Sequence, residues 1–493
     1  MTALSRAIAD PRPVHGLAAR SPLAGLDRRS LGFVDVLGQS VGAVAPSAAA
    51  ATCPVLVATR AGSGTLVAFL LAGVLMAIVA GAVNQFTRRL AATGSLYTFA
   101  AKGLGVRAGF ATSAAMLTGY GFVAMFALLG AAYYTLTLLA HAGMRGAVSQ
   151  LPVVVLLAGF GGLCFLVLRR GVRLSTRVTL VIELLSIVAV LALIAVLLSR
   201  VPAAEFWRVA VPHGVSAAQL AGGTTVAVTA FVGFESAATL GAESRRPFAT
   251  IPRTIRWTVI ASGVLYLLSA YTQLAGFDAF GGTLAASASP VNDLAARAGV
   301  DGIGLVLDAA LACSFLACAL ASTTAFARVL FSLGREGIAP RALGRTHGRF
   351  RTPHVALAVG VVIEVAVPAA LVAVGLDAWQ AMGVIVVCAA AGYITAYAFV
   401  CVATPLFLRR IGELTLAPAV AAAVGAAGLV AVLAADLWME ATGTRALAVA
   451  LLGAVAAIAW LLYAVCRRTR PRALSRIGLF DEATAEDVLG GTP

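Results

Sequence analysis

A carboxyl group stands inside a long apolar segment near the middle of the chain. The segment spans residues 217–240 and contains the run Phe231–Glu235 (FVGFE). An ionisable side chain in such a segment is costly if the segment crosses a bilayer, and it indicates a functional site. Four glycines weaken the surrounding helix: Gly222, Gly223, Gly233 and Gly241. We therefore expect this helix to be interrupted in order to hold a ligand.

A second weak point lies in the first apolar segment, where small residues lead to Pro46. Proline removes a helical hydrogen bond, so the backbone is broken near the middle of the segment. Taken alone, this pattern is equally typical of a simple proline kink. The two weak points are five segments apart, which places the second half of the chain upside down relative to the first. Paired interruptions in two inverted halves indicate the binding site of a carrier.

The two breaks would offer free backbone groups to a ligand. A half-helix beginning around Gly42–Val44 would present its positive N-terminal end to a carboxylate. We expect free carbonyls of residues 230–233 to accept hydrogen bonds from an ammonium group. The predicted contacts are the backbone of Ser40, Val41, Gly42 and Ala43, the backbone of Ala230 and Gly233, and the rings of Phe231 and Phe234. Ordinary helix packing would explain the two phenylalanines as well, and a back-bonded helix serine would explain Ser40.

The remaining ionisable residues inside apolar segments have separate interpretations. Asp35 and Asp308 lie near segment ends, where they are hydrated. We interpret Glu235 and Pro46 as structural braces of the broken helices, because a negative charge stabilises a helix N-terminus. Glu364 has no interpretation beyond an inward-facing polar contact.

Composition places the chain in a membrane. Hydrophobic residues make up 60% and charged residues 12% of the 493 residues, against roughly 45–50% and about 25% in soluble domains. In a soluble chain the net charge of +15 would suggest a nucleic acid partner; here we expect none, and the charge is sorted to one side of the bilayer. The seven cysteines form no CxxC pair, so we expect neither a metal nor a cofactor.

A bilayer crossing requires about 20 apolar residues. Twelve segments qualify: 33–57, 65–86, 108–140, 151–168, 178–199, 217–240, 257–275, 303–327, 355–375, 380–408, 416–437 and 446–466. With the N-terminus inside, all but six of the 36 Lys and Arg residues fall on the cytoplasmic side, the exceptions being Arg60, Arg145, Arg200, Arg208, Arg297 and Arg445. This bias predicts a multi-pass protein of the cytoplasmic membrane with both termini in the cytoplasm. All basic residues except Lys102 are Arg, which indicates a bacterial source with a GC-rich genome.

Three motifs in order resemble those of the amino acid–polyamine–organocation (APC) permeases. The first follows the second span at Arg88–Tyr97, and the second is FVGFE with the following Gly241–Arg253. The third runs from Ala327 to Pro340 and continues at Arg351–Pro353. The resemblance covers about residues 31–410. It departs in the first span, where Ser40–Ala43 has fewer glycines than many amino acid permeases carry.

The resemblance implies an all-α membrane protein of the LeuT type. Two inverted five-helix repeats (31–210 and 211–410) would carry broken helices 1 and 6, followed by two extra helices (411–466), between cytoplasmic tails at 1–30 and 467–493. It also implies secondary transport of amino acids or related small amines. Some members couple transport to protons through a lysine in the fifth span, which this chain lacks; Glu183 is the nearest ionisable group there. Glu183 could therefore take up the coupling proton. A salt bridge to a cytoplasmic-side arginine would explain a glutamate in this span equally well.

Several alternatives stay open. Sodium coupling would require oxygen ligands, for which Ser314 is the best placed of the eighth-span hydroxyls, but we rank it below protons. A channel would require a continuous polar pore, and the spans hold only scattered charges. A membrane enzyme would require a catalytic cluster, which is not evident, so we expect none. A ligand receptor that moves nothing would share the same fold.

Overall fold

The computed structural model describes residues 23, 25–141, 143–144, 149–201, 209, 211–287, 289–299, 302–441 and 446–481. Within these residues the regular elements are helices, and an isolated β-bridge pairs Leu31 with Ser244. Most of the predicted N-terminal tail (1–30) and the end of the C-terminal tail (467–493) lie outside the described residues. The all-helical membrane architecture expected from the sequence is confirmed at this level.

Eleven segments of the described chain are long and apolar enough to cross a bilayer. The first, Phe33–Thr87, is 55 residues long, although one crossing requires about 20. It contains α2 (Phe33–Val44), α3 (Pro46–Ala61), the 3-10 turn η1 (Gly62–Gly64) and α4 (Thr65–Thr87). The predicted spans 33–57 and 65–86 thus follow each other closely, with a break at Ala45 in the first and a turn between them at Gly62, whose φ of 52° is left-handed.

The predicted span 217–240 covers both α10 (Ala217–Thr229) and η2 (Phe234–Leu240), and each of the remaining predicted spans overlaps a single helix of the structure. In chain order the elements are α5 (Leu96–Leu104), α6 (Val106–His141), α7 (Gln150–Arg169), α8 (Val172–Arg200), α10 (Ala217–Thr229), η2 (Phe234–Leu240), α11 (Pro247–Phe280), η3 (Leu284–Ala286), α12 (Pro290–Arg297), α13 (Gly302–Glu336), η4 (Arg341–Gly344), α14 (His354–Ala373), α15 (Ala378–Arg410), α16 (Leu416–Ala441), α17 (Ala446–Thr469) and α18 (Pro471–Leu474).

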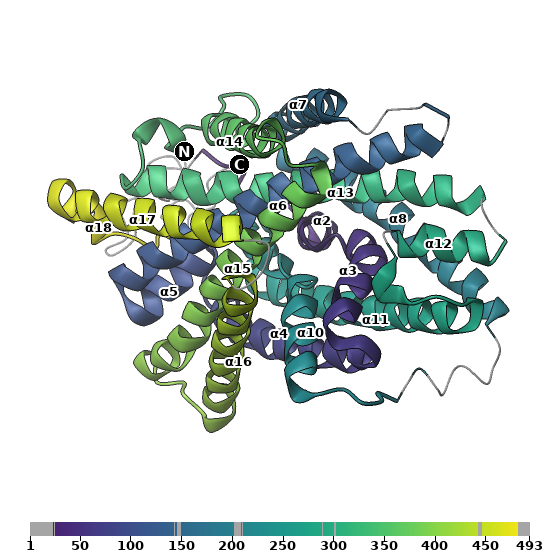
Figure 1. Ribbon diagram of the computed structural model, residues 1–493. Coiled ribbons are helices and arrows are strands. Elements are labelled where there is room, and N and C mark those ends of the chain that lie inside the picture. Colours follow the sequence, from purple (N-terminus) through teal and green to yellow (C-terminus); the bar gives the residue numbers. More distant parts are fainter. Residues whose placement is uncertain are drawn as a thin grey trace, which may run out of the picture.

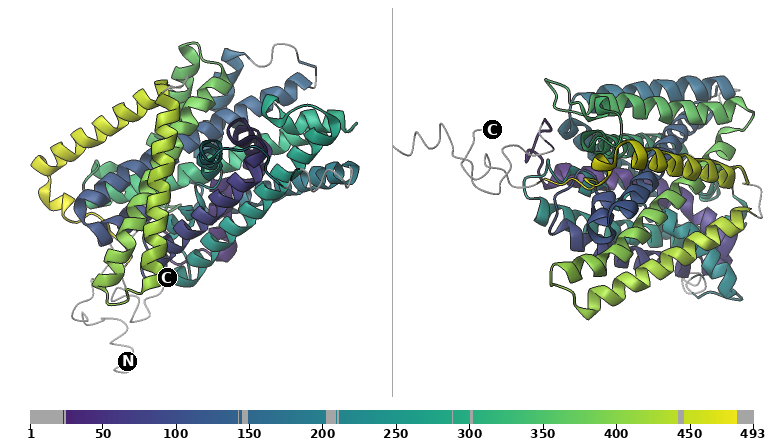
Figure 2. Two further views of the ribbon diagram at one scale, coloured as in Figure 1. Left: turned by 60° about the horizontal axis from the view of Figure 1, so that its bottom comes forward. Right: turned by 90° about the vertical axis from the view of Figure 1, so that its left-hand side faces the viewer.

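The broken helix α2–α3 lies in the middle of the bundle (Figure 1). Helices α7 and α14 cover one side of it and α16 lies on the opposite side. The long helix α6 packs along both α13 and α15, which forms the central wall. Helix α17 lies along the outside, and no residue of its most apolar window is buried (Figure 2).

Two local backbone features make the breaks. Ala45 ends α2 in a left-handed conformation (φ 47°), and Pro46 begins α3. Proline suits a first helical position because its missing N–H has no intrahelical partner there in any case. In the second broken helix, α10 ends at Thr229, and Gly233 with φ 101° begins η2. A Cβ at Gly233 would lie 2.8 Å from the carbonyl oxygen of Ala43, so glycine lets the two breaks touch.

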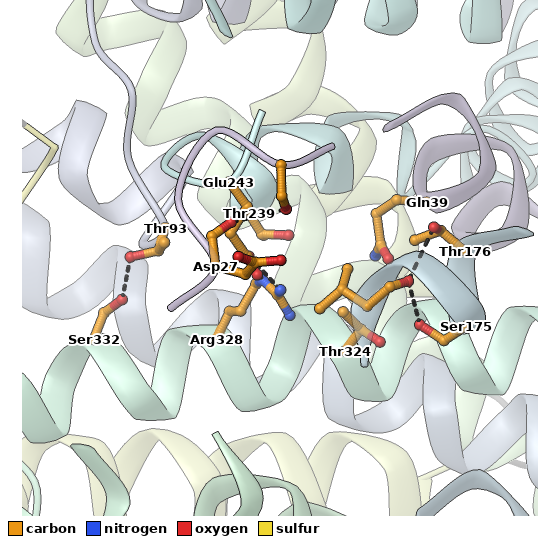
Figure 3. A network of polar contacts seen from close by, with 12 residues as sticks. Asp27, Gln39, Thr93, Ser175, Thr176, Thr239, Glu243, Thr324, Arg328 and Ser332 are labelled. Carbon is orange, nitrogen blue, oxygen red and sulfur yellow. Dashed lines mark hydrogen bonds and ion pairs between the residues drawn. The ribbon is translucent and has the colours of Figure 1, made fainter. Parts of the chain in front are cut away.

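One end of the bundle is closed by polar contacts. Arg328 and Glu243 form a buried ion pair, with Arg328 Nε donating to Glu243 Oε2 at 3.0 Å (Figure 3). Burial raises the pKa of the Glu243 carboxyl, and the guanidinium of Arg328 opposes that rise. Beside it the hydroxyls of Thr93 and Ser332 lie 2.8 Å apart. These contacts join the loops that follow the second and sixth predicted spans to α13.

The C-terminal segment crosses the same end. The carboxylate of Glu336 at the end of α13 accepts hydrogen bonds from the amides of Gly478 and Leu479 at 2.7 and 2.8 Å. Asp481 pairs with Arg28, with two hydrogen bonds of 3.0 Å, and its amide donates to the carbonyl of Ala91 at 2.7 Å. The segment therefore ties the chain before α2 to the loop before α5 and to α13.

Candidate functional site

A cavity of about 560 Å³ lies between the two helix breaks. It reaches from the breaks to the connection between α14 and α15, at the end of the bundle opposite the Arg328–Glu243 pair. Its walls come from both broken helices and from α6, α13 and α15. The lining residues include Ala43, Val44, Ala45, Ala48, Thr52, Cys53, Val123, Phe126, Thr229, Ala230, Val232, Phe315, Cys318, Trp379, Gln380, Met382, Val386 and Ala389.

The cavity is mainly apolar and carries no Asp, Glu, Lys, Arg or His among the described residues that line it. Its polar side chains are hydroxyls, thiols and one amide, belonging to Thr52, Cys53, Thr229, Cys318 and Gln380. Ligand pockets of this kind bind an apolar body and orient it through a few polar groups. A charged side chain on a ligand would have no ionic partner within this lining.

Side chains hold the two breaks against each other. The hydroxyl of Ser40 donates to the carbonyl of Phe234 at 2.6 Å, and the hydroxyl of Ser236 donates to the carbonyl of Gln39 at 3.1 Å. The amide of Gln39 donates to the carbonyl of Ala321 on α13 at 2.8 Å. All of these side chains are buried. The ends of α2 and η2 are thus fixed as one unit against α13.

The polar backbone of the second break is only partly free. The carbonyl of Ala230 accepts a hydrogen bond from the hydroxyl of Tyr266 at 2.7 Å. The amide of Gly233 donates to the hydroxyl oxygen of Tyr397 at 3.2 Å. A carbonyl has two lone pairs, so the carbonyl of Ala230, a residue that lines the cavity, can accept a second hydrogen bond.

Glu235 is buried at the start of η2 and receives two tyrosine hydroxyls. Tyr120 of α6 donates to Oε1 at 2.8 Å, and Tyr397 of α15 donates to Oε2. The carboxylate thus links the second broken helix to both long helices of the central wall. These contacts support the predicted bracing role, although the role itself stays a prediction.

Glu183 is a residue of α8, and its carboxylate lies at the N-terminus of α3. Its Oε1 accepts hydrogen bonds from the amide of Ser47 at 2.9 Å and from the hydroxyl of Ser47 at 2.7 Å. Its Oε2 accepts from the hydroxyl of Ser314 on α13 at 2.7 Å. A half-helix N-terminus attracts an anion, and here the anion comes from the protein itself. Among the described residues, the hydrogen-bond partners of Glu183 are neutral groups, and no arginine pairs with it.

The half-helix begins later than the sequence indicated. The prediction around Gly42–Val44 was wrong, because α2 continues to Val44 and α3 begins at Pro46. Small residues alone do not end a helix whose side chains are packed; a Cβ at Gly42 would overlap the methyl group of Thr179 on α8. Pro46 determines where the second half of the broken helix starts.

The predicted contact residues fall into two groups. Ala43 and Ala230 line the cavity. The backbone of residues 40–42 is the last helical turns of α2, and Gly233 packs on Ala43. Phe231 packs edge-on against Tyr266 with ring centroids 5.0 Å apart, and Phe234 stacks on Tyr397 at 5.3 Å. Neither ring lines the cavity, and substrate contact by either stays a prediction.

Sequence reasoning missed the partners of the two carboxylates. Tyr120, Tyr266 and Tyr397 hold the second break, and Ser47 holds Glu183. A usable signal existed, since a carboxylate inside an apolar span requires donors from other spans. Hydroxyl groups within the spans were the candidates, but their spacing does not show which of them meet.

Comparisons with known proteins show the family of the chain. A sequence profile of the family described as amino acid permease matches residues 35–439. The chain belongs to the amino acid permease family. It is therefore a multi-pass membrane transporter of amino acids or related compounds, and its family is not enzymatic.

Three relatives show the range of transporters to which the chain is similar. The chain is 25% identical to a methylthioribose transporter of Bacillus subtilis, over 69% of this chain and 75% of that protein. It is 27% identical to a branched-chain amino acid permease of Lactococcus lactis subsp. cremoris, over 64% and 70%. It is 31% identical to an uncharacterized transporter of Mycobacterium tuberculosis, over 68% and 73%. These permeases differ in their named substrates, so the family alone does not give this chain its ligand.

Proposed function

We propose that this permease carries small zwitterionic amino acids with apolar side chains by alternating access. The observation that supports this most is the cavity between the two breaks, which lacks charged side chains and is walled by alanine, valine and aromatic residues. The free lone pair of the Ala230 carbonyl would accept from the substrate ammonium. The named branched-chain relative agrees with an apolar side chain, whereas methylthioribose would need more polar partners.

In this proposal the stretch Phe33–Thr87 crosses twice, giving twelve crossings with both termini in the cytoplasm. The cavity then opens to the outside, and the Arg328–Glu243 pair closes the cytoplasmic end. The two five-helix repeats at 31–210 and 211–410 remain part of the proposal. Figure 3 shows the polar contacts that would have to separate for the cytoplasmic end to open.

Coupling to protons would run through Glu183. Its carboxylate occupies the N-terminus of α3 through Ser47, where a substrate carboxylate would also be stabilised. A proton on Glu183 removes the competing negative charge, so protonation and substrate binding support each other. Sodium is the second candidate because the hydroxyls of Ser47 and Ser314 and the Glu183 carboxylate are neighbouring oxygens, the donor type that sodium prefers.

Uptake into liposomes that contain the purified protein tests the proposal. We expect valine, leucine and isoleucine to be taken up when the outside is acidic, and lysine and glutamate to be excluded. Uptake that follows a sodium gradient and ignores pH would replace the proton with sodium. Binding without uptake would make the protein a receptor, and exclusion of all five amino acids would refute the substrate class.

A pair of variants on α13 tests the cavity. Cys318→Phe fills it, because Cys318 lines it, whereas Cys313 on the same helix is exposed outside it. We expect Cys318→Phe to lower uptake more than about tenfold and Cys313→Phe to leave it unchanged. Equal uptake by both variants would place the substrate elsewhere.

A further inference from the structure

A second hollow of about 470 Å³ lies at the closed end, away from the cavity. Three segments and Glu243 form it: residues 27–31 before α2, residues 170–177 around the start of α8, and residues 349–352 before α14. Each segment joins or begins a membrane-spanning helix. The hollow therefore lies at the level where lipid headgroups meet the protein.

The hollow is strongly basic. Five arginines line it against two acidic residues, Asp27 and Glu243. Glu243 is already paired with the buried Arg328, which does not line the hollow. Arg351 lies 3.6 Å from Asp27, and Arg177 pairs with Asp35 at 2.8 Å. The acidic groups are thus all engaged, and the lining keeps an excess of positive charge.

Three of the five arginines, Arg170, Arg173 and Arg349, have no acidic partner among the described residues. Arg170, between α7 and α8, makes no ion pair there, and Arg349 contacts only the ring of Phe350 with its guanidinium. Arg173 donates to the carbonyl of Ser30 at 2.6 Å, which orients its group without neutralising it. Guanidinium groups match the oxygens of a phosphate in shape and charge.

We propose that this hollow binds the phosphodiester headgroup of an anionic phospholipid. Basic pockets at the cytoplasmic side of membrane helices attract such headgroups. The adjoining face of α8 is apolar and open: Leu174, Val181 and Leu185 are 45%, 57% and 67% exposed. Their spacing of seven and four residues places them on one stripe of the helix. The acyl chains lie along this stripe, which a free phosphate would not use.

The occupant would touch the chain that leads into α2 and the loop before α14. In the closed state both segments lie against the hollow, and the lipid would join them across it. An anionic lipid therefore stabilises the closed end. The binding site itself does not depend on what the permease transports.

Native mass spectrometry of the full-length protein in detergent tests the proposal. The probes are phosphatidylglycerol, phosphatidylcholine and glycerol phosphate. We expect phosphatidylglycerol to bind at least about tenfold more tightly than phosphatidylcholine, because each basic residue near the site attracts the net negative charge of phosphatidylglycerol and phosphatidylcholine has no net charge. Equal binding of the two lipids would overturn the proposal, and glycerol phosphate binding as tightly as the lipid would assign the hollow to a free phosphate ester.

Matched variants locate the site. The double variant Arg170→Gln/Arg349→Gln removes two exposed arginines from the hollow, and Arg467→Gln/Arg468→Gln removes two exposed arginines at the end of α17. We expect the first to weaken phosphatidylglycerol binding about tenfold and the second to leave it unchanged. Equal losses in both would show diffuse attraction to positive charge and would overturn the site.

Discussion

At the scale of single residues, the buried carboxylates act as joints between helices. Glu235 holds η2 to α6 and α15 through two tyrosine hydroxyls. Tyr397 has a double role, because it donates to Glu235 and accepts from the amide of Gly233. A buried carboxylate is tolerated only when such donors satisfy it. Tyr397 thus forms hydrogen bonds with both the Glu235 carboxylate and the backbone of the second break.

Replacing Tyr397 should separate these roles from simple packing. Tyr397→Phe leaves Glu235 with one hydroxyl donor and the Gly233 amide without its acceptor, which costs about 1–3 kcal/mol of stability for each unsatisfied group. Tyr393 on the same helix is equally buried, but its hydroxyl has no hydrogen-bond partner among the described residues. Tyr393→Phe is the control and should change the unfolding temperature little. A similar loss in both variants would mean that ring packing, and not the hydroxyl, holds the break.

Glu183 gives a prediction on pH. A proton on Glu183 frees the N-terminus of α3, so substrate affinity should rise as the outside pH falls. Glu183→Gln keeps an acceptor for Ser47 but cannot take up a proton. We expect its substrate affinity to be independent of pH while exchange of bound for free substrate continues, as measured by titration across pH 5–8. An unchanged pH dependence would remove Glu183 from the coupling.

The sequence identified these carboxylates but not their partners. Glu183 and Glu235 stand out because each interrupts an apolar segment. Their donors lie on helices more than one hundred positions away in the chain, such as Tyr120 with Glu235 and Ser47 with Glu183. Which hydroxyl faces which carboxylate depends on the rotation of each helix about its axis, and an apolar sequence on all sides leaves that rotation open.

At the scale of elements, backbone conformation places the breaks. Pro46 and Ala45 determine where α3 begins, and Gly233 determines how closely the second break approaches. The sequence predicted both interruptions because proline and glycine act locally. It misplaced the start of α3 because the small residues before Pro46 are held helical by packing against α8 and α13. The turn at Gly62 also joins two predicted spans without a polar loop.

Gly233→Ala should weaken the contact between the breaks. The position has φ 101°, and a Cβ would lie 2.8 Å from the Ala43 carbonyl oxygen. Strain of this kind costs about 1–3 kcal/mol, and we expect a lower unfolding temperature together with reduced substrate affinity. Gly81 on α4 is the control, because a Cβ there would meet nothing within 4 Å. Gly81→Ala should leave both measurements unchanged or raise stability slightly; equal effects would refute a special role for Gly233.

At the scale of the whole molecule, the two ends of the bundle differ. The cavity reaches one end, and a buried ion pair with several hydroxyl contacts closes the other. Membrane location and family were predictable from composition and from the three motifs. The sequence does not predict which end of the bundle is closed. Both states of a carrier are built from one sequence, and they differ by little free energy.

We expect Arg328 and Glu243 to stabilise the protein as a unit, so that losing one of them costs more than losing both. Arg328→Met leaves the buried Glu243 carboxylate without its cation, and breaking a buried pair costs about 3–5 kcal/mol. Replacing both, as Arg328→Met with Glu243→Gln, removes the unpaired charge and should recover much of that loss. Thermal unfolding of the two variants checks this. If the double variant is no more stable than the single one, the pair does not act as a unit.

The pairing of Arg28 with Asp481 has a consequence for the order in which the protein is made. All the candidate spanning helices precede Arg470, so the ribosome has already produced them before residue 481 exists. The amides that bind Glu336 also come from this last stretch. A nascent chain can therefore insert its whole bundle while this end still lacks the contacts made by residues 478–481. Translation has to reach residue 481 before the Arg28–Asp481 pair can form, and a premature stop codon just after α18 would leave every spanning helix in place with these contacts missing.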